Sequence, residues 1–174
     1  MKEKKLEDIM LFSLGKNTSR LNTDAIVVYT QEDFEKDLQG TKNLSTDTEC
    51  IINLIKSKAA PLSEANNKKC ITANFLKCSF DTQILDPWFF CYQFNESKHL
   101  LQQINMFHQG TTLSVKKLTV KNIRELKIPF LNIERQKVIG SIYKQMLMQK
   151  HLMVQQTKNI ERLSIEIIKK IEED

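Results

Sequence analysis

Residues 110–136 read GTTLSVKKLTVKNIRELKIPFLNIERQ and lead directly into a segment whose apolar residues recur every seven positions. The chain from Ile133 to Glu173 contains no proline, and Asn132 stands where an N-cap side chain would accept a hydrogen bond from the first free amide groups. This pattern predicts one long helix with a coiled-coil stripe. The stripe is made of Ile139, Ile142, Met146, Met153, Ile160, Leu163 and Ile167.

A helix over residues 133–173 would be roughly 60 Å long at 1.5 Å per residue, which is too long for the preceding domain to cover. The stripe therefore predicts a second helix as its partner, as in a dimer. Gln149 and Gln156 interrupt the seam, and polar seam residues weaken a coiled coil while they fix its register and orientation. The alternative is a long helix that folds back on its own domain, because surface helices carry similar stripes.

The length of 174 residues suits one globular domain, or a domain with an appendage, and a hydrophobic content of 41% permits a true core. The N-terminal residues, MKEKKLEDIMLF, lack the long apolar stretch and the cleavage site of a signal peptide. No run reaches membrane-spanning length, so a cytoplasmic protein is expected. The four cysteines lie in apolar contexts without a CxxC pair and are expected to be reduced core thiols.

Basic residues are concentrated in two stretches of a chain whose net charge is +5. One is GKNTSR, residues 15–20, and the other spans residues 110–127, where Glu125 is the only acidic residue. Lysine and arginine suit phosphate contacts, and asparagine, serine and arginine can also reach base edges. Both stretches therefore indicate nucleic-acid binding, although lysine runs are also common on ordinary solvated faces.

The order of expected elements is mixed. Strands or extended segments are predicted at residues 5–14, 25–30, 49–55 and 70–80. Helices are predicted at 31–38, 87–107 and 119–126, and the second of these could be one helix or two joined near Asn95. This order predicts an α+β fold, with a domain over residues 1–132 and a long helix over residues 133–174.

Arrangements that support catalysis are absent from the sequence. The three histidines lie in polar, helical contexts, and none has a matched acid or cysteine at a motif spacing. Neither a P-loop nor a dinucleotide fingerprint is present. A zinc site from Cys70, Cys78, Cys91 and His99 is conceivable, but structural zinc sites use more closely spaced ligand pairs. No catalytic residue, metal or cofactor is expected.

The same residues resemble a known family, the specificity subunit of type I restriction-modification systems, and one half of it. SLGKNTSRLN at residues 13–22 resembles the opening of a target-recognition domain, and DPWFFCYQFNES at 86–97 resembles one of its helices. The most specific part is residues 110–136, with a Gly-Thr loop, a short helix, a proline-containing exit and Glu-x-Gln at the start of the long helix. That pattern falls on Gly110, Thr111, Leu118, Ile123, Leu126, Ile128, Pro129, Glu134 and Gln136.

The resemblance implies a non-catalytic subunit that reads DNA in host defence. The family's two recognition domains are held apart by two antiparallel helices, so a half-length chain would dimerise to read a bipartite site on double-stranded DNA. The expected partners are a methyltransferase subunit and, indirectly, a nuclease or translocase subunit; S-adenosylmethionine, ATP and Mg²⁺ are expected only in those subunits. The candidate DNA-binding residues are Lys16, Asn17, Ser19, Arg20, Gly110, Thr111, Thr112, Lys116 and Lys117.

Two departures from the family pattern are visible. Leu131 and Asn132 stand where the family has further prolines, which predicts a less rigid angle between domain and helix. The domain is also short. Two other functions remain open: a stand-alone DNA-binding or inhibitory half-subunit, and a non-catalytic coiled-coil interaction protein.

Overall fold

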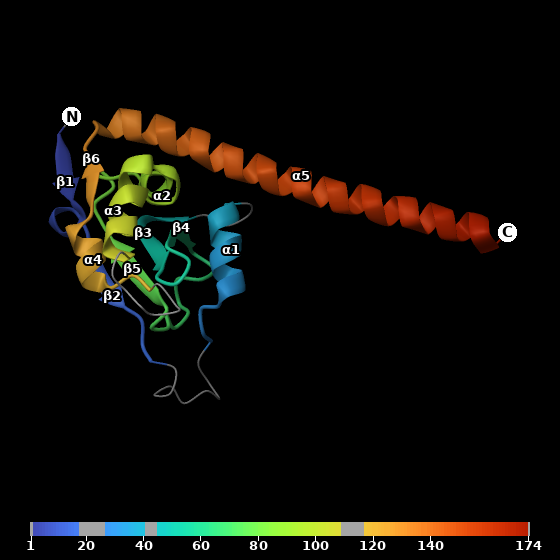
Figure 1. Cartoon of the computed structure of the whole chain (residues 1–174), viewed down its shortest axis with the longest axis horizontal. Helices are drawn as coiled ribbons and strands as arrows, with labels where there is room; N and C mark the ends of the chain where they lie inside the picture. Colours follow the sequence, from blue (N-terminus) through green and yellow to red (C-terminus); the bar gives the residue numbers. More distant parts are fainter. Residues whose placement is uncertain (1, 18–26, 41–44, 109–116, 174) are drawn as a thin grey trace.

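The computed structural model describes residues 2–17, 27–40, 45–108 and 117–173. It has an α+β domain from which one long helix, α5, projects (Figure 1). The chain's N-terminal strand lies close to the start of this helix, on the same side of the domain. The predicted fold class is therefore confirmed.

The domain is built on an antiparallel sheet of four strands in the order β2-β5-β3-β4. These strands are β2 (Leu11–Leu14), β3 (Ser45–Asn53), β4 (Lys58–Ser63) and β5 (Phe75–Ser79). A separate ribbon pairs β1 (Glu3–Lys5) with β6 (Lys127–Pro129), and a short 3₁₀ helix, η1 (Leu6–Asp8), follows β1. The ribbon ties the N-terminus to the segment that enters α5.

Helices cover both faces of the sheet. The helix α1 (Gln31–Gln39) packs Phe34 against Ile51 and Leu62, on the face formed by one set of alternating residues. The opposite set, which includes Ile52 and Leu76, packs against α2 (Pro87–Glu96), α3 (Lys98–His108) and α4 (Val120–Glu125). The result is two apolar cores separated by the sheet.

Local hydrogen-bond chemistry explains where several helices begin. Thr30 forms a capping box with Asp33 at the start of α1, and Thr119 accepts a hydrogen bond from the Asn122 amide of α4 at 3.2 Å. Asp86 caps α2, which starts with Pro87 as predicted. The predicted helix at residues 87–107 is two helices, with the break at Ser97.

The strand predictions were partly wrong. Residues 27–30 of the strand predicted at 25–30 form only an isolated bridge between Val28 and Cys70. The strand predicted at 70–80 is regular only from Phe75 to Ser79, and β4 was not predicted because Pro61 lies within it. Proline is tolerated there because β4 is an edge strand of the sheet.

The long helix α5 spans Ile133–Glu173, as predicted, and Asn132 caps it by accepting a hydrogen bond from the Arg135 amide at 3.0 Å. Only its first turns pack on the domain, chiefly on α2 through the buried residues Gln136, Gly140 and Tyr143. All residues from 152 to 173 are exposed, and Figure 1 shows this part extending away from the domain. The helix does not fold back on its own domain.

Hydrogen bonds from buried side chains hold the junction between α5 and the domain. Gln136 donates to the carbonyl of Ile84 at 3.0 Å and accepts from the amide of Asp86 at 3.1 Å. The Tyr143 hydroxyl accepts from the Asn95 amide at 3.1 Å, and burial raises the pKa of this phenol well above its ordinary value. The junction thus has anchors that do not depend on the missing prolines.

The cysteines are free, and three of them are buried. Cys50 and Cys91 approach within 3.9 Å between sulfur atoms, and burial raises the pKa of the Cys50 thiol. Cys70 is half-exposed, which corrects the expectation that all four lie in the core. Among the described residues, no helix combines the length and the apolar character that crossing a membrane requires.

Candidate nucleic-acid interface

The structure brings the described parts of the two basic stretches together. The amide of Lys16 donates to the carbonyl of Ile71 at 2.8 Å, and the carbonyl of Lys16 accepts from the amide of Ala73 at 2.9 Å. The ammonium group of Lys117 donates to the carbonyl of Ala73, also at 2.8 Å. Residues 71–74 therefore connect two lysines that are far apart in the sequence, and Asn17 follows directly after Lys16. The other candidates lie outside the described residues: Ser19, Arg20, Gly110, Thr111, Thr112 and Lys116.

The close approach of the chain before Lys16 requires a glycine. A Cβ atom at Gly15 would lie 2.0 Å from the carbonyl oxygen of Thr72 and 2.6 Å from that of Ile71. No side chain fits at such distances, so Gly15 lets the end of β2 pass against residues 71–72. This contact fixes where Lys16 stands on the domain.

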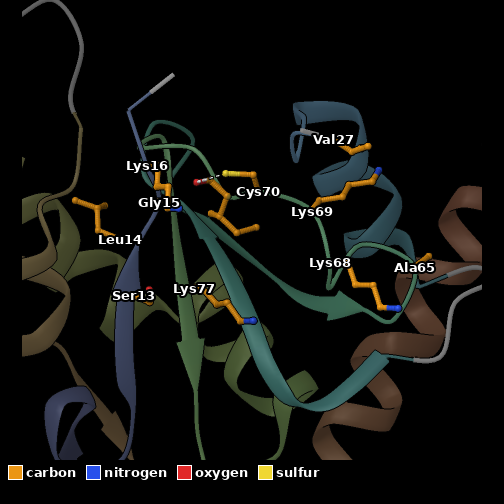
Figure 2. A pocket seen from close by; sticks show the side chains of 11 residues that line it. Ser13, Leu14, Gly15, Lys16, Val27, Ala65, Lys68, Lys69, Cys70 and Lys77 are labelled. Carbon is orange, nitrogen blue, oxygen red and sulfur yellow. Dashed lines mark hydrogen bonds between the residues drawn. The ribbon is translucent and has the colours of Figure 1, made fainter. Parts of the chain in front are cut away.

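Beside Lys16 the surface forms an open hollow of about 740 Å³ (Figure 2). It exists because α1 packs over β3, β4 and Phe75 of β5 but does not extend over Ser13 of β2 and Lys77 of β5, which are paired neighbours on the same face. The turn that carries Lys68 and Lys69 forms another side of the hollow. Sequence reasoning missed Lys68, Lys69 and Lys77; the adjacent pair in ANNKKC was the one available signal.

The lysines of the hollow differ in their electrostatic partners. The Lys69 ammonium lies 2.7 Å from a carboxylate oxygen of Asp33, and that of Lys77 lies 2.9 Å from one of Glu49. Within the described residues, no acidic group pairs with Lys16 or Lys68, and both side chains are exposed. These two cations are therefore available to an anionic partner such as DNA phosphate.

A polar network positions the turn that bears Lys68 and Lys69. The Asp37 carboxylate of α1 accepts hydrogen bonds from the Tyr29 hydroxyl and from the Asn66 side chain, each at 2.9 Å. Burial raises the pKa of Asp37, and these hydrogen bonds only partly offset the effect. Burial would also raise the pKa of Asp33, but hydrogen bonds, first that from Lys69, outweigh it and lower the pKa. Two carboxylates of one helix thus hold the lysine turn in place.

The second candidate site is the apolar stripe of α5. Six of its seven residues are exposed, with exposed fractions between 50% and 63%: Ile142, Met146, Met153, Ile160, Leu163 and Ile167. Ile139 differs because it is partly buried against the domain core, next to the docked face of the helix. The stripe therefore begins at the domain and continues along the projecting part of α5.

The described residues contain no cluster of three or more histidine, cysteine, aspartate or glutamate side chains placed to hold a metal ion. Of the cysteines considered for zinc, Cys78 and Cys91 are buried in the core whereas Cys70 faces the hollow.

No protein-family model matches the sequence, and no curated protein matches it. Solved structures do match the fold. A chain from a structural study of complex assembly and conformational transition in the type I R-M system matches with a TM-score of 0.59 and 15% identity, over 93% of this chain and 43% of that one.

Two further matches are specificity subunits by name. The HsdS subunit from Thermoanaerobacter tengcongensis matches with a TM-score of 0.54 and 14% identity, over 90% of this chain and 39% of that one. The type I restriction-modification S subunit from M. genitalium matches with a TM-score of 0.53 and 13% identity, over 81% and 37%. The fold is therefore that of specificity subunits, and the chain spans less than half the length of these relatives.

Proposed function

We propose that this chain is a half-length DNA-recognition subunit of a type I restriction-modification system. In this role it reads one half of a bipartite DNA site and performs no chemistry itself. A methyltransferase subunit, and through it a nuclease subunit, would bind the assembled specificity factor. Those subunits would supply S-adenosylmethionine, ATP and Mg²⁺.

The observation that carries the proposal is the match over 93% of this chain, which includes both the domain and α5, to less than half of a larger structure. A specificity factor of full length needs a second half. The exposed stripe on α5 offers the means to recruit one, because exposed apolar side chains at heptad spacing favour pairing with another helix. Pairing of two copies would complete the factor.

The positions of Lys16, Lys68 and Lys117 on the domain support a role in DNA binding. Lys16 follows the end of β2, and Figure 1 shows this end of the domain on the side away from α5. The helix α5 and these lysines lie on opposite sides of the domain. The lysines would therefore stay accessible to DNA when two α5 helices pair. In this proposal Lys16, Lys68 and Lys117 would contact phosphates, and Asn17 would contact base edges.

The length of α5 sets the geometry of the site. A helix of roughly 60 Å corresponds to about 18 base pairs at 3.4 Å each. Two recognition domains on antiparallel helices would therefore read half-sites separated by several base pairs. Two-fold symmetry of a homodimer would make the site an interrupted palindrome.

Co-expression with a type I modification subunit from the same source, followed by a map of N6-methyladenine in host DNA, tests the proposal. A bipartite palindromic motif is expected for a homodimer, and an asymmetric motif would mean that a different half supplies the second arm. A variant with Lys16→Ala and Lys68→Ala is the matched control, since it should co-purify with the modification subunit but methylate less. Failure of the two proteins to associate would contradict the proposal and favour a coiled-coil interaction protein.

A further inference from the structure

We infer that a groove at the start of β2 is the docking site for a basic, apolar segment on the surface of the modification subunit. This acidic groove is lined by carboxylate residues and apolar residues, chiefly Glu7, Asp8, Asp81, Leu11 and Ile84. The inference rests on the proposed function, and it places a contact with that subunit on the recognition domain itself.

The first observation is the charge of the acidic groove. Asp8 and Asp81 are exposed, and neither forms a salt bridge with another of the described residues. The carboxylate of Glu7 is paired with Lys5 at 3.0 Å. Carboxylates repel DNA phosphates and attract lysine or arginine side chains. In a chain whose net charge is +5, this part of the surface therefore fits a basic protein and not DNA.

The second observation is that apolar residues lie exposed beside these carboxylates. Leu11 is 77% exposed on β2, an edge strand of the four-stranded sheet, and Ile84 is 37% exposed. Leu11 is paired with Ser79 of β5, so both side chains lie on the same face of the sheet, and both residues line the groove. Edge strands usually carry charged residues, so an exposed leucine there favours a protein partner. The groove, of about 390 Å³, has room for a few side chains of that partner.

The third observation is that the backbone on both sides of the acidic groove is fixed. Leu11 belongs to the ladder between β2 and β5. The amide of Ile84 donates to the carbonyl of Asp81 at 3.0 Å, and the carbonyl of Ile84 accepts from the Gln136 side chain of α5, also at 3.0 Å. The groove is therefore formed before a partner binds, which lowers the cost of binding.

The position of the acidic groove identifies the partner. Leu11 and Ser13 lie on the same face of β2, and Ser13 lines the lysine hollow. Five residues separate Leu11 from Lys16, a distance of at most roughly 17 Å at 3.3 Å per residue. A protein docked in the groove would stand beside the DNA without covering the lysines. The modification subunit needs this position, and its own contacts with DNA require basic side chains near that edge.

The experiment measures the affinity of the full-length chain for the modification subunit from the same source, without DNA, by calorimetric titration at low and high salt. Asp8→Lys replaces attraction by repulsion and should weaken binding by about tenfold or more at low salt, and by less at high salt. Leu11→Ala should weaken binding by about tenfold at both salt concentrations, because it removes an apolar contact that salt does not screen.

Matched controls separate these effects from general weakening. Glu32→Lys reverses an exposed acidic residue on α1, outside the groove, and should leave the affinity for the modification subunit unchanged. Leu14→Ala removes a half-exposed side chain of the same type from the same strand, also outside the groove, and should do the same. Leu11→Ala should bind duplex DNA as the unaltered chain does, which also shows that its domain is folded.

The inference is overturned if Asp8→Lys or Leu11→Ala binds the modification subunit with unchanged affinity, because the subunit then contacts another surface. It is also overturned if Leu11→Ala weakens binding to DNA but not to the subunit, since the groove would then belong to the DNA interface. In both cases the proposed function still stands. If the unaltered chain does not bind the modification subunit, the proposed function fails and the inference fails with it.

Discussion

At the residue scale, substitution of single lysines beside the hollow tests whether this surface binds DNA. Lys16→Ala and Lys68→Ala should each lower the slope of log affinity against log salt by about one, because each removes one phosphate contact. Filter binding or anisotropy over a series of salt concentrations measures the slope. Lys158→Ala is the matched control, since Lys158 is exposed on the projecting part of α5. An unchanged slope would remove these lysines from the interface.

The ion pair between Asp33 and Lys69 predicts a pH dependence of stability. The pKa of Asp33 is lowered in the folded protein, so its stabilising effect is present above about pH 4 and is lost as the pH falls through the folded pKa. Asp33→Asn should lower the free energy of unfolding by about 1 kcal/mol at pH 7 and by less at pH 3. Urea denaturation at both pH values measures this.

Glu32→Gln provides the comparison for Asp33. Glu32 lies on the same helix in an exposed pair with Lys36, where its side chain is 76% exposed, and such pairs contribute little. Its substitution should leave stability nearly unchanged at both pH values. An equal loss for Asp33→Asn at pH 7 and pH 3 would show that the ion pair is not the cause.

Single residues could be predicted from the sequence where their hydrogen-bond partners are close by in the chain. Asn132 was predicted as a cap because its side chain bonds an amide only three residues away. Lys68 was not predicted as a site residue, since its importance comes from Asp33 and Asp37 holding the turn against α1. Contacts between distant segments leave no periodic signal in a single sequence.

At the scale of helices and strands, Gly140 allows α5 to pack closely on α2. An alanine Cβ there would lie 2.8 Å from the Phe89 amide nitrogen and 2.2 Å from a carboxylate oxygen of Asp86. Glycine to alanine inside an exposed helix stabilises by about 1 kcal/mol, but here the overpacking should reverse the sign and destabilise by about 1–3 kcal/mol. Urea denaturation measures the change, with the neighbouring exposed Ser141→Ala as control. A raised midpoint for Gly140→Ala would contradict this.

Helices and strands were predicted correctly where the sequence had one clear hydrophobic periodicity. The prediction failed where pairing between strands determines whether a segment forms a strand. The heptads of α5 specify a helix on their own. The strand β4 contains Pro61 and was missed, because only its edge position in the sheet makes proline acceptable there. Residues 27–30 have a β-branched sequence, yet they find only one bridge to the turn at Cys70 and form no strand.

For the whole molecule, the fold separates two surfaces that a specificity factor would need. The hollow with its lysines lies at the end of β2. The apolar stripe runs along α5, which leaves the domain on the other side. Hydrogen bonds at Gln136 and Tyr143 hold α5 to the domain that carries the lysines. Pairing of two α5 helices would therefore fix the distance between the hollows of the two domains. The resemblance suggested this arrangement, whereas the anchors were visible only in the structure.

This arrangement predicts that the purified chain is a dimer held by α5. Ile160→Lys should raise the dimer dissociation constant by about a hundredfold or more, because a buried isoleucine contributes roughly 1.5–3 kcal/mol and the dimer contains two. Sedimentation equilibrium measures the constant. The domain should unfold as before, since residues 152–173 are exposed and make no part of its core.

Gln155→Lys introduces the same side chain on another face of the same turns and should leave the dimer intact. This pair distinguishes loss of the seam from a general effect of added charge. If both variants dissociate, charge repulsion along the helix is responsible, and if neither does, the stripe is not the contact. Dissociation by Ile160→Lys alone, together with normal binding to a single half-site, would show that α5 joins two recognition domains that read DNA independently.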